Sequence, residues 1–153
     1  MIKVTYECSI NQSIDKIWNV ISNFGNIDRY HPEVAKSELQ SEITHGLGAV
    51  RKCVFNNGGS SIEKVIQWID GSTLTVELSE MSMPLKSASG FTSLKAIDDR
   101  TTQVTIGMNY IFKYGLFGAF IGHFIMKPMM LKMFGKAAKS IEYYIVNGNK
   151  MHK

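Results

Sequence analysis

The sequence lacks the residue patterns that mark most metal sites and catalytic centres. Its two cysteines, Cys8 and Cys53, are too far apart for a zinc or redox motif, and each lies in a strand-like run typical of a buried, inert thiol. There is no Ser–His–Asp pattern, no glycine-rich phosphate loop and no cluster of metal-binding carboxylates. We therefore expect no metal and no cofactor, and these patterns identify no catalytic group.

Long apolar runs and runs of one charge are missing as well. The longest apolar stretch, residues 115–126, is too short to cross a membrane as a helix, which takes about 20 residues. The net charge is +4, but no five like charges occur in a row, which argues against a nucleic-acid partner. Residues 1–6 alternate like a strand and do not resemble a signal peptide, so we expect a cytoplasmic protein.

The remaining composition is that of an ordinary globular protein. The chain has 153 residues, of which 44% are hydrophobic and 20% are charged. Because neither an internal repeat nor a linker divides the chain, we predict a single domain over residues 1–147. Residues 148–153 are expected to form a flexible tail.

Alternating apolar and polar residues predict seven strands joined by short links. They are expected at residues 2–10, 34–44, 49–55, 61–69, 73–78, 86–97 and 101–112. The link Asn57-Gly58-Gly59 is a strong hairpin signal, because Asn and Gly tolerate a positive φ. Short links between consecutive strands predict an antiparallel sheet.

Helical spacing appears in two parts of the sequence. After the first strand, apolar residues three and four apart predict a short helix over residues 14–21, with Ser13 as its N-cap, and a second short turn over residues 26–30. A long helix is predicted to begin near Pro128. Four methionines gather where it begins: Met126, Met129, Met130 and Met133. Flexible thioethers suit a surface that adapts to different apolar ligands, and ordinary core packing is the alternative.

This order of elements resembles the polyketide cyclase/dehydrase and lipid-transport family of the START-like (SRPBCC) superfamily. The matching residues are 17–24, Tyr30-His31-Pro32, 48–51, Asn57-Gly58-Gly59 with Glu63, and 126–130. The resemblance implies an α+β helix-grip fold, in which a seven-stranded antiparallel sheet curls around a long C-terminal helix and two short helices follow the first strand. A sheet curled around a helix leaves space for a cavity between them.

Arg51 and Glu63 are the most informative polar pair, because they flank the predicted hairpin. If both point inward, they form a paired charge inside an apolar cavity, which could bind a polar ligand group or perform acid–base chemistry. If both point outward, they form a surface pair of little energy, and the hairpin register decides between these arrangements. The predicted ligand-binding residues are Arg51, Glu63, Trp68, Phe91, Met108, Tyr110, Met130 and Phe134.

Three functions fit this sequence. The first is a binding or carrier protein for a hydrophobic small molecule, such as a lipid, a polyketide-like compound or an aromatic compound. The second is a cyclase/dehydrase-type enzyme that uses Arg51 with Glu63, or His31, as polar groups in the same cavity. The third is weak peripheral contact with a membrane through residues 115–126 and nearby lysines. The sequence predicts neither the identity of the ligand nor the oligomeric state.

Overall fold

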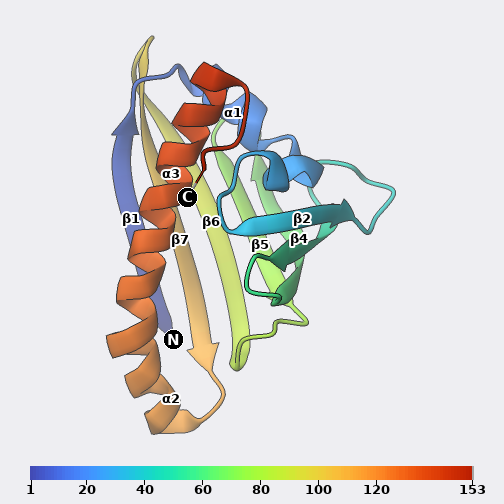
Figure 1. Cartoon of the computed structure of the whole chain (residues 1–153), viewed down its shortest axis with the longest axis vertical. Helices are drawn as coiled ribbons and strands as arrows, with labels where there is room; N and C mark the ends of the chain where they lie inside the picture. The colour runs from blue at the N-terminus through green and yellow to red at the C-terminus, as the bar shows by residue number, and fades with distance from the viewer. Residues whose placement is uncertain (153) are drawn as a thin grey trace.

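The computed structural model describes residues 1–152, within which seven strands form one antiparallel sheet (Figure 1). The strands are β1 (Ile2–Ile10), β2 (Val34–Leu39), β3 (Val50–Phe55), β4 (Ser60–Ile69), β5 (Thr73–Ser79), β6 (Leu85–Asp98) and β7 (Thr101–Phe112). Their order across the sheet is β1-β7-β6-β5-β4-β3-β2, so the first strand pairs with the last. The predicted α+β helix-grip architecture is confirmed.

The helices are α1 (Ile14–Ile21), the 3-10 helix η1 (Phe24–Arg29), α2 (Gly115–Ile121), the π-helix η2 (Gly122–Met126) and α3 (Lys127–Asn147). The short α1 begins as predicted, since the Ser13 side chain accepts a hydrogen bond from the Lys16 backbone N–H. Its apolar face is buried, and the Trp18 ring donates from Nε1 to Asp70 at 3.0 Å. In Figure 1, α3 lies across β1 and β7, with α1 near its C-terminal end.

The long C-terminal helix begins earlier than predicted. It starts at Gly115 and continues through α2, η2 and α3 for 33 residues, whereas the sequence pattern predicted a start near Pro128. A proline inside a helix removes one hydrogen bond and crowds the carbonyl four residues before it, here that of Phe124. Phe124 belongs to the π-helix η2, and we attribute the tolerance of Pro128 to this wider turn.

Strand β2 is shorter than predicted, and one residue of the predicted tail contacts it. β2 ends at Leu39, and just beyond it the Val50 backbone N–H donates to the Ser41 hydroxyl at 2.8 Å, so a side chain takes the place of a backbone partner. The chain then turns through Gly46 and Gly48, whose φ angles of 88° and 86° favour glycine. At the other terminus, Lys150 donates from Nζ to the Val34 carbonyl at 2.6 Å, so this part of the predicted tail contacts β2. Residue 153, also in that tail, lies outside the described residues.

Both cysteines are free thiols, and they lie in different strands. Cys53 is buried in β3, and Cys8 is half-buried in β1. Burial, followed by the nearby Glu63 carboxylate, raises the pKa of Cys53 to about 12. Its thiol is therefore uncharged at neutral pH, in keeping with the inert role expected from the sequence.

Candidate functional site

A cavity of about 880 Å³ lies between α3 and the inner face of the sheet. This volume is within the usual range of small-molecule sites, about 300–1,000 Å³. Strands β2 to β7 supply one wall together with the β3–β4 and β5–β6 links, while α1, η1, the link after η1 and α3 supply the rest. The cavity reaches the surface where its lining residues are exposed: Asn57, Gly58, Ser82, Met129, Lys132 and Lys136.

Most of the wall is apolar, and methionine is the most distinctive component. Six of the nine methionines line the cavity: Met81, Met83, Met108, Met129, Met130 and Met133. Unbranched thioether side chains change rotamer easily, so this wall can adapt to ligands of different shape. Met81 and Met83 belong to the link between β5 and β6 and are not among the ligand-binding residues predicted from the sequence. The high methionine content was the only sequence signal for them.

The polar part of the wall is built around Arg51 and Glu63, which face each other across β3 and β4. Arg51 donates from Nε at 2.9 Å and from Nη2 at 2.6 Å to one oxygen of Glu63, Oε2. Their side chains are only 6% and 11% exposed, so the inward arrangement is the one that the structure contains. The other oxygen, Oε1, accepts a longer bond of 3.4 Å from the Ser61 hydroxyl.

Residue Phe24 holds the other side of the Arg51 side chain. Its backbone carbonyl accepts a hydrogen bond of 2.7 Å from Arg51 Nη1, and its ring lies 4.1 Å from the guanidinium carbon. Burial acts to lower the pKa of Arg51, but the Glu63 carboxylate and smaller contributions outweigh it and raise that pKa. Arg51 therefore stays charged, and with Glu63 it forms a pair of zero net charge.

Two further polar side chains line this part of the cavity. Burial raises the pKa of Tyr30 to about 12, so its hydroxyl stays protonated at neutral pH. Burial lowers the pKa of His31 to about 4, so its ring is neutral. The Nδ1 atom of His31 accepts a hydrogen bond of 3.2 Å from the Glu33 backbone N–H, which assigns the proton to Nε2. His31 is thereby suited to donate a hydrogen bond and poorly suited to accept a proton.

The eight residues predicted to bind ligand fall into three groups. Five have side chains that line the cavity: Arg51, Glu63, Met108, Met130 and Phe134. Trp68 and Tyr110 lie in the core outside the lining: the Trp68 ring centroid is 5.1 Å from that of Trp18, and the Tyr110 hydroxyl donates to the Gly122 carbonyl at 2.7 Å.

Phe91 forms the third group by itself, since it borders the cavity while its ring lies on the opposite face of the sheet. It pairs with Gly107, and a Cβ atom at Gly107 would overlap the Phe91 ring. Gly107 alternates with the inward-facing Met108, so this overlap lies on the outer face. Lys3, which is exposed on β1, places its ammonium group 5.9 Å from the ring centroid. Phe91 therefore borders the cavity through its backbone.

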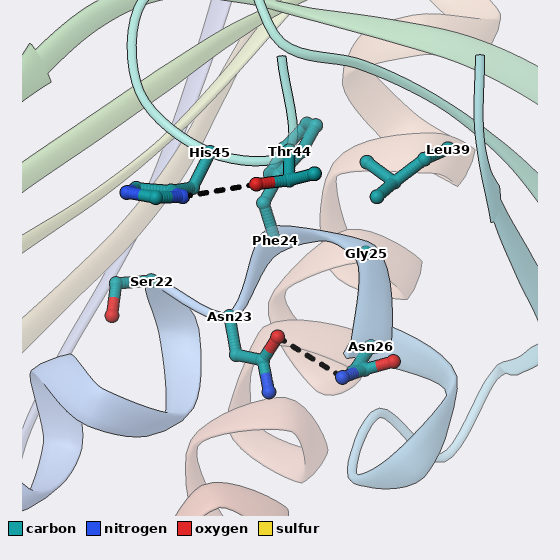
Figure 2. Close-up of a pocket in the computed structure, with 8 residues that line it drawn as sticks. All are labelled: Ser22, Asn23, Phe24, Gly25, Asn26, Leu39, Thr44 and His45. Carbon is teal, nitrogen blue, oxygen red and sulfur yellow. Dashed lines mark hydrogen bonds between the residues drawn. The ribbon is translucent and has the colours of Figure 1, made fainter. Parts of the chain in front are cut away.

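A second, smaller pocket lies beside η1, as Figure 2 shows. It has a volume of about 300 Å³ and is lined by Ser22, Asn23, Phe24, Gly25, Asn26, Leu39, Thr44 and His45. Its polar side chains pair with each other: Asn26 donates to Asn23 at 3.0 Å, and Thr44 lies 3.2 Å from His45 Nδ1. The large cavity has the deeper apolar wall and a buried ion pair, and it is the better candidate site.

Two other features are absent from the part of the chain that the structure describes. Within residues 1–152, no three His, Cys, Asp or Glu side chains are grouped so that they could hold a metal ion. Among the helices of the same residues, none is both long enough and apolar enough to cross a membrane.

Seven antiparallel strands curled around a long C-terminal helix define the START-like, helix-grip class of fold. The sequence matches, over residues 1–144, the family described as polyketide cyclase / dehydrase and lipid transport. The chain therefore belongs to this family, as the sequence resemblance implied. A comparison with curated protein sequences finds no match.

Solved structures share the fold at low sequence identity. Protein XoxI from Bacillus cereus has 16% identity and a TM-score of 0.77, with 96% of this chain and 97% of that chain covered. A START superfamily protein from Mycobacterium smegmatis has 13% identity and a TM-score of 0.76, with 96% and 99% covered. A norcoclaurine synthase point mutant from Thalictrum flavum, in complex with a transition state analogue, has 16% identity and a TM-score of 0.72, with 96% and 95% covered. At these identities the similarity establishes the fold alone.

Proposed function

We propose that this protein binds or carries a hydrophobic small molecule in the cavity between the sheet and α3. The candidates are a lipid, a polyketide-like compound or an aromatic compound. The supporting observation is the cavity of about 880 Å³, whose mainly apolar wall contains one buried ion pair. Such a wall favours an apolar ligand body, and a few fixed polar groups orient it.

The polar groups favour a ligand with a neutral oxygen, such as a hydroxyl or a carbonyl. Arg51 has five N–H donors, of which the contacts to Glu63 and to the Phe24 carbonyl use three. The Cys53 thiol is a further hydrogen-bond partner of Arg51, which leaves one N–H group that can serve a ligand oxygen. A ligand carboxylate would gain from Arg51 but would be repelled by Glu63, which makes an anionic group a poorer match.

Binding can be tested with the fluorescent probe N-phenyl-1-naphthylamine and with native mass spectrometry of the purified protein. We expect a bound apolar compound or saturable binding of the probe. The variant Met130→Trp fills the cavity from α3 and should weaken probe binding about tenfold or more. Val146→Trp, at an exposed position of the same helix, is the matched control and should bind normally. Absence of any bound compound together with absence of probe binding would refute the proposal, as would normal binding by Met130→Trp.

The second candidate function is a cyclase/dehydrase-type enzyme that uses the same cavity. The observation that favours it is Glu63, whose Oε1 accepts a long hydrogen bond of 3.4 Å from the Ser61 hydroxyl and lies in the wall of an apolar cavity. In this function Oε1 would accept a proton from the substrate, and Arg51 would orient the carboxylate. The test is incubation of a recovered ligand with the protein. A carrier returns the ligand unchanged, whereas an enzyme converts it and loses the conversion in Glu63→Gln while retaining binding.

A further inference from the structure

The helical segment that precedes α3 buries two glycines and leaves most of its large apolar residues exposed. Gly118 and Gly122 are buried against the sheet. A Cβ atom at Gly118 would lie 2.8 Å from Phe112 Cβ, and one at Gly122 would lie 2.7 Å from Ile2 Cδ1. Glycine at these positions therefore lets the helix approach β1 and β7 closely. Met126 is buried and Ile121 is half-buried, while the other large apolar side chains of the segment are exposed.

Those large side chains form an exposed apolar patch, which we call the α2 patch. It consists of Leu116, Phe117, Phe120, Phe124, Ile125 and Met129, all exposed. Leu116 is 93% exposed and Phe117 is 70% exposed, and the rings of Phe120 and Phe124 lie 4.7 Å apart. Figure 1 places α2 at one end of the elongated molecule. Neighbouring apolar side chains left in water in this way mark a surface for interaction with a partner.

The charged side chains that flank the α2 patch along the chain all have one sign. Residues 101–141 contain five lysines and no aspartate or glutamate. Lys113 precedes α2, Lys127 follows η2, and Lys132 lies one turn further along α3. Aromatic and aliphatic side chains flanked by lysines on a helix are the features of a segment that lies in the interface of an anionic membrane.

The α2 patch also borders the opening of the cavity. Met129 belongs to both, since it is exposed beside Ile125 and lines the cavity. On the other side, the Lys113 backbone N–H donates to the Pro84 carbonyl at 3.1 Å, and the preceding residue, Met83, lines the cavity. A surface that covers the α2 patch therefore also faces the opening.

We propose that the α2 patch docks onto an anionic lipid bilayer, with its apolar side chains in the interface and the flanking lysines at the headgroups. A second copy of this chain is the less suitable occupant, because a two-fold contact through this patch would bring the lysines of both copies together. Docking does not require a ligand in the cavity. If the cavity carries a lipid, docking would place its opening at the membrane.

The test is co-sedimentation of the purified protein with phosphatidylcholine vesicles, with and without phosphatidylglycerol. We expect binding only when phosphatidylglycerol is present, and loss of binding at about 1 M salt, where charges are screened beyond about 3 Å. Leu116→Ser combined with Phe117→Ser should weaken binding about tenfold or more. Ile69→Ser combined with Ile97→Ser removes two exposed apolar side chains elsewhere and should bind normally.

The lysines are tested with a second matched pair of variants. Changing Lys113, Lys127 and Lys132 to Gln should weaken binding by about fivefold for each lysine. Changing Lys52, Lys64 and Lys95 to Gln alters the net charge equally and should have a clearly smaller effect, because these exposed lysines lie on strands away from the α2 patch. Phe117→Trp should show a blue-shifted emission on anionic vesicles, which reports contact by this segment itself.

Several outcomes would overturn docking. They are no binding to either vesicle, equal binding to both, or equal losses in the α2-patch variants and their controls. A dimer in solution that the Leu116→Ser and Phe117→Ser changes dissociate, without vesicle binding, would assign the patch to a second copy instead. The probe experiment on the cavity uses no membrane, so failure of docking and failure of ligand binding are distinguishable.

Discussion

The buried Arg51–Glu63 pair allows a quantitative test of the candidate site. Removing either partner alone leaves the other charge buried and unpaired, which typically costs about 3–5 kcal/mol of the free energy of unfolding. We therefore expect a loss of this size in Arg51→Met and again in Glu63→Leu. The double variant replaces both charges with apolar side chains, and such replacements are often close to neutral. Its loss should be well below the sum of the two single losses.

The magnitude of the coupling follows from the geometry. Two hydrogen bonds, of 2.9 and 2.6 Å, join a guanidinium and a carboxylate that are almost inaccessible to solvent. At an effective dielectric constant of about 20, charges about 4 Å apart attract by about 4 kcal/mol, and desolvation offsets part of this. Single losses of about 3–5 kcal/mol each, with a double loss smaller than either of them, require a coupling free energy of about 3 kcal/mol or more.

The assay is urea unfolding at pH 7 of the wild type, both single variants and the double variant. Sucrose is added equally to all four so that the least stable variant remains folded. Lys36 and Glu38 supply the matched control pair: their separation is also 2.6 Å, but their side chains are 65% and 53% exposed. Their cycle should be additive within error. Single losses of Arg51→Met and Glu63→Leu that add to the double loss within about 0.5 kcal/mol would refute the coupling and remove the strongest polar part of the site.

Three further predictions concern His31, Phe134 and Gly107. The folded-state pKa of His31, about 4, lies below its unfolded value of 6.5, so the stability that neutral His31 contributes is complete above pH 6.5 and is lost as the pH falls toward 4. In urea titrations over that pH range, the wild type should lose about 3 kcal/mol of unfolding free energy relative to His31→Asn. Parallel pH profiles of the two proteins would contradict this. Phe134→Ala should cost less than Phe112→Ala, which we place at about 3–5 kcal/mol, because Phe134 lines the cavity whereas the buried Phe112 does not. Phe134→Ala should also change probe binding; equal losses with unchanged binding would show that Phe134 is ordinary core. Gly107→Ala should lower the free energy of unfolding by about 1–3 kcal/mol because its Cβ atom crowds the Phe91 ring, and adding Phe91→Leu should restore part of that stability. If thermal unfolding shows no restored stability, the contact with Phe91 is not the cause of the loss.

Local sequence patterns predicted the sheet well because they depend on neighbouring residues. The alternation from Val104 to Phe112 identified the inner face of β7, and the turn at Asn57-Gly58-Gly59 placed Arg51 opposite Glu63. Whether that pair points inward could not be predicted, since a shift of one residue in the register reverses the two faces of a strand.

The predictions that were wrong have specific physical causes. Phe91 was predicted to line the cavity because its side chain is large. Along β6 it alternates with the inward-facing positions that include the buried Ala88 and Leu94, so its side chain points to the opposite face of the sheet. The early part of the C-terminal helix packs against the sheet through Gly118 and Gly122. Glycine by itself disfavours helix, and no local sequence pattern reveals this packing, so the helix was predicted to begin later. Long-range packing thus decided the features that the sequence analysis missed.

The position of the ion pair argues for a role in binding. A buried pair of opposite charges is a weak source of stability, because apolar side chains of similar volume often serve the fold equally well. Arg51 and Glu63 lie in the wall of a cavity, and the contacts of Arg51 with Glu63, Phe24 and Cys53 leave one of its N–H donors available beside the neutral groups of Tyr30 and His31. An unfilled donor in an apolar wall costs free energy unless a ligand or water meets it. A ligand oxygen is the partner that would supply both the missing hydrogen bond and a fixed orientation for an apolar molecule.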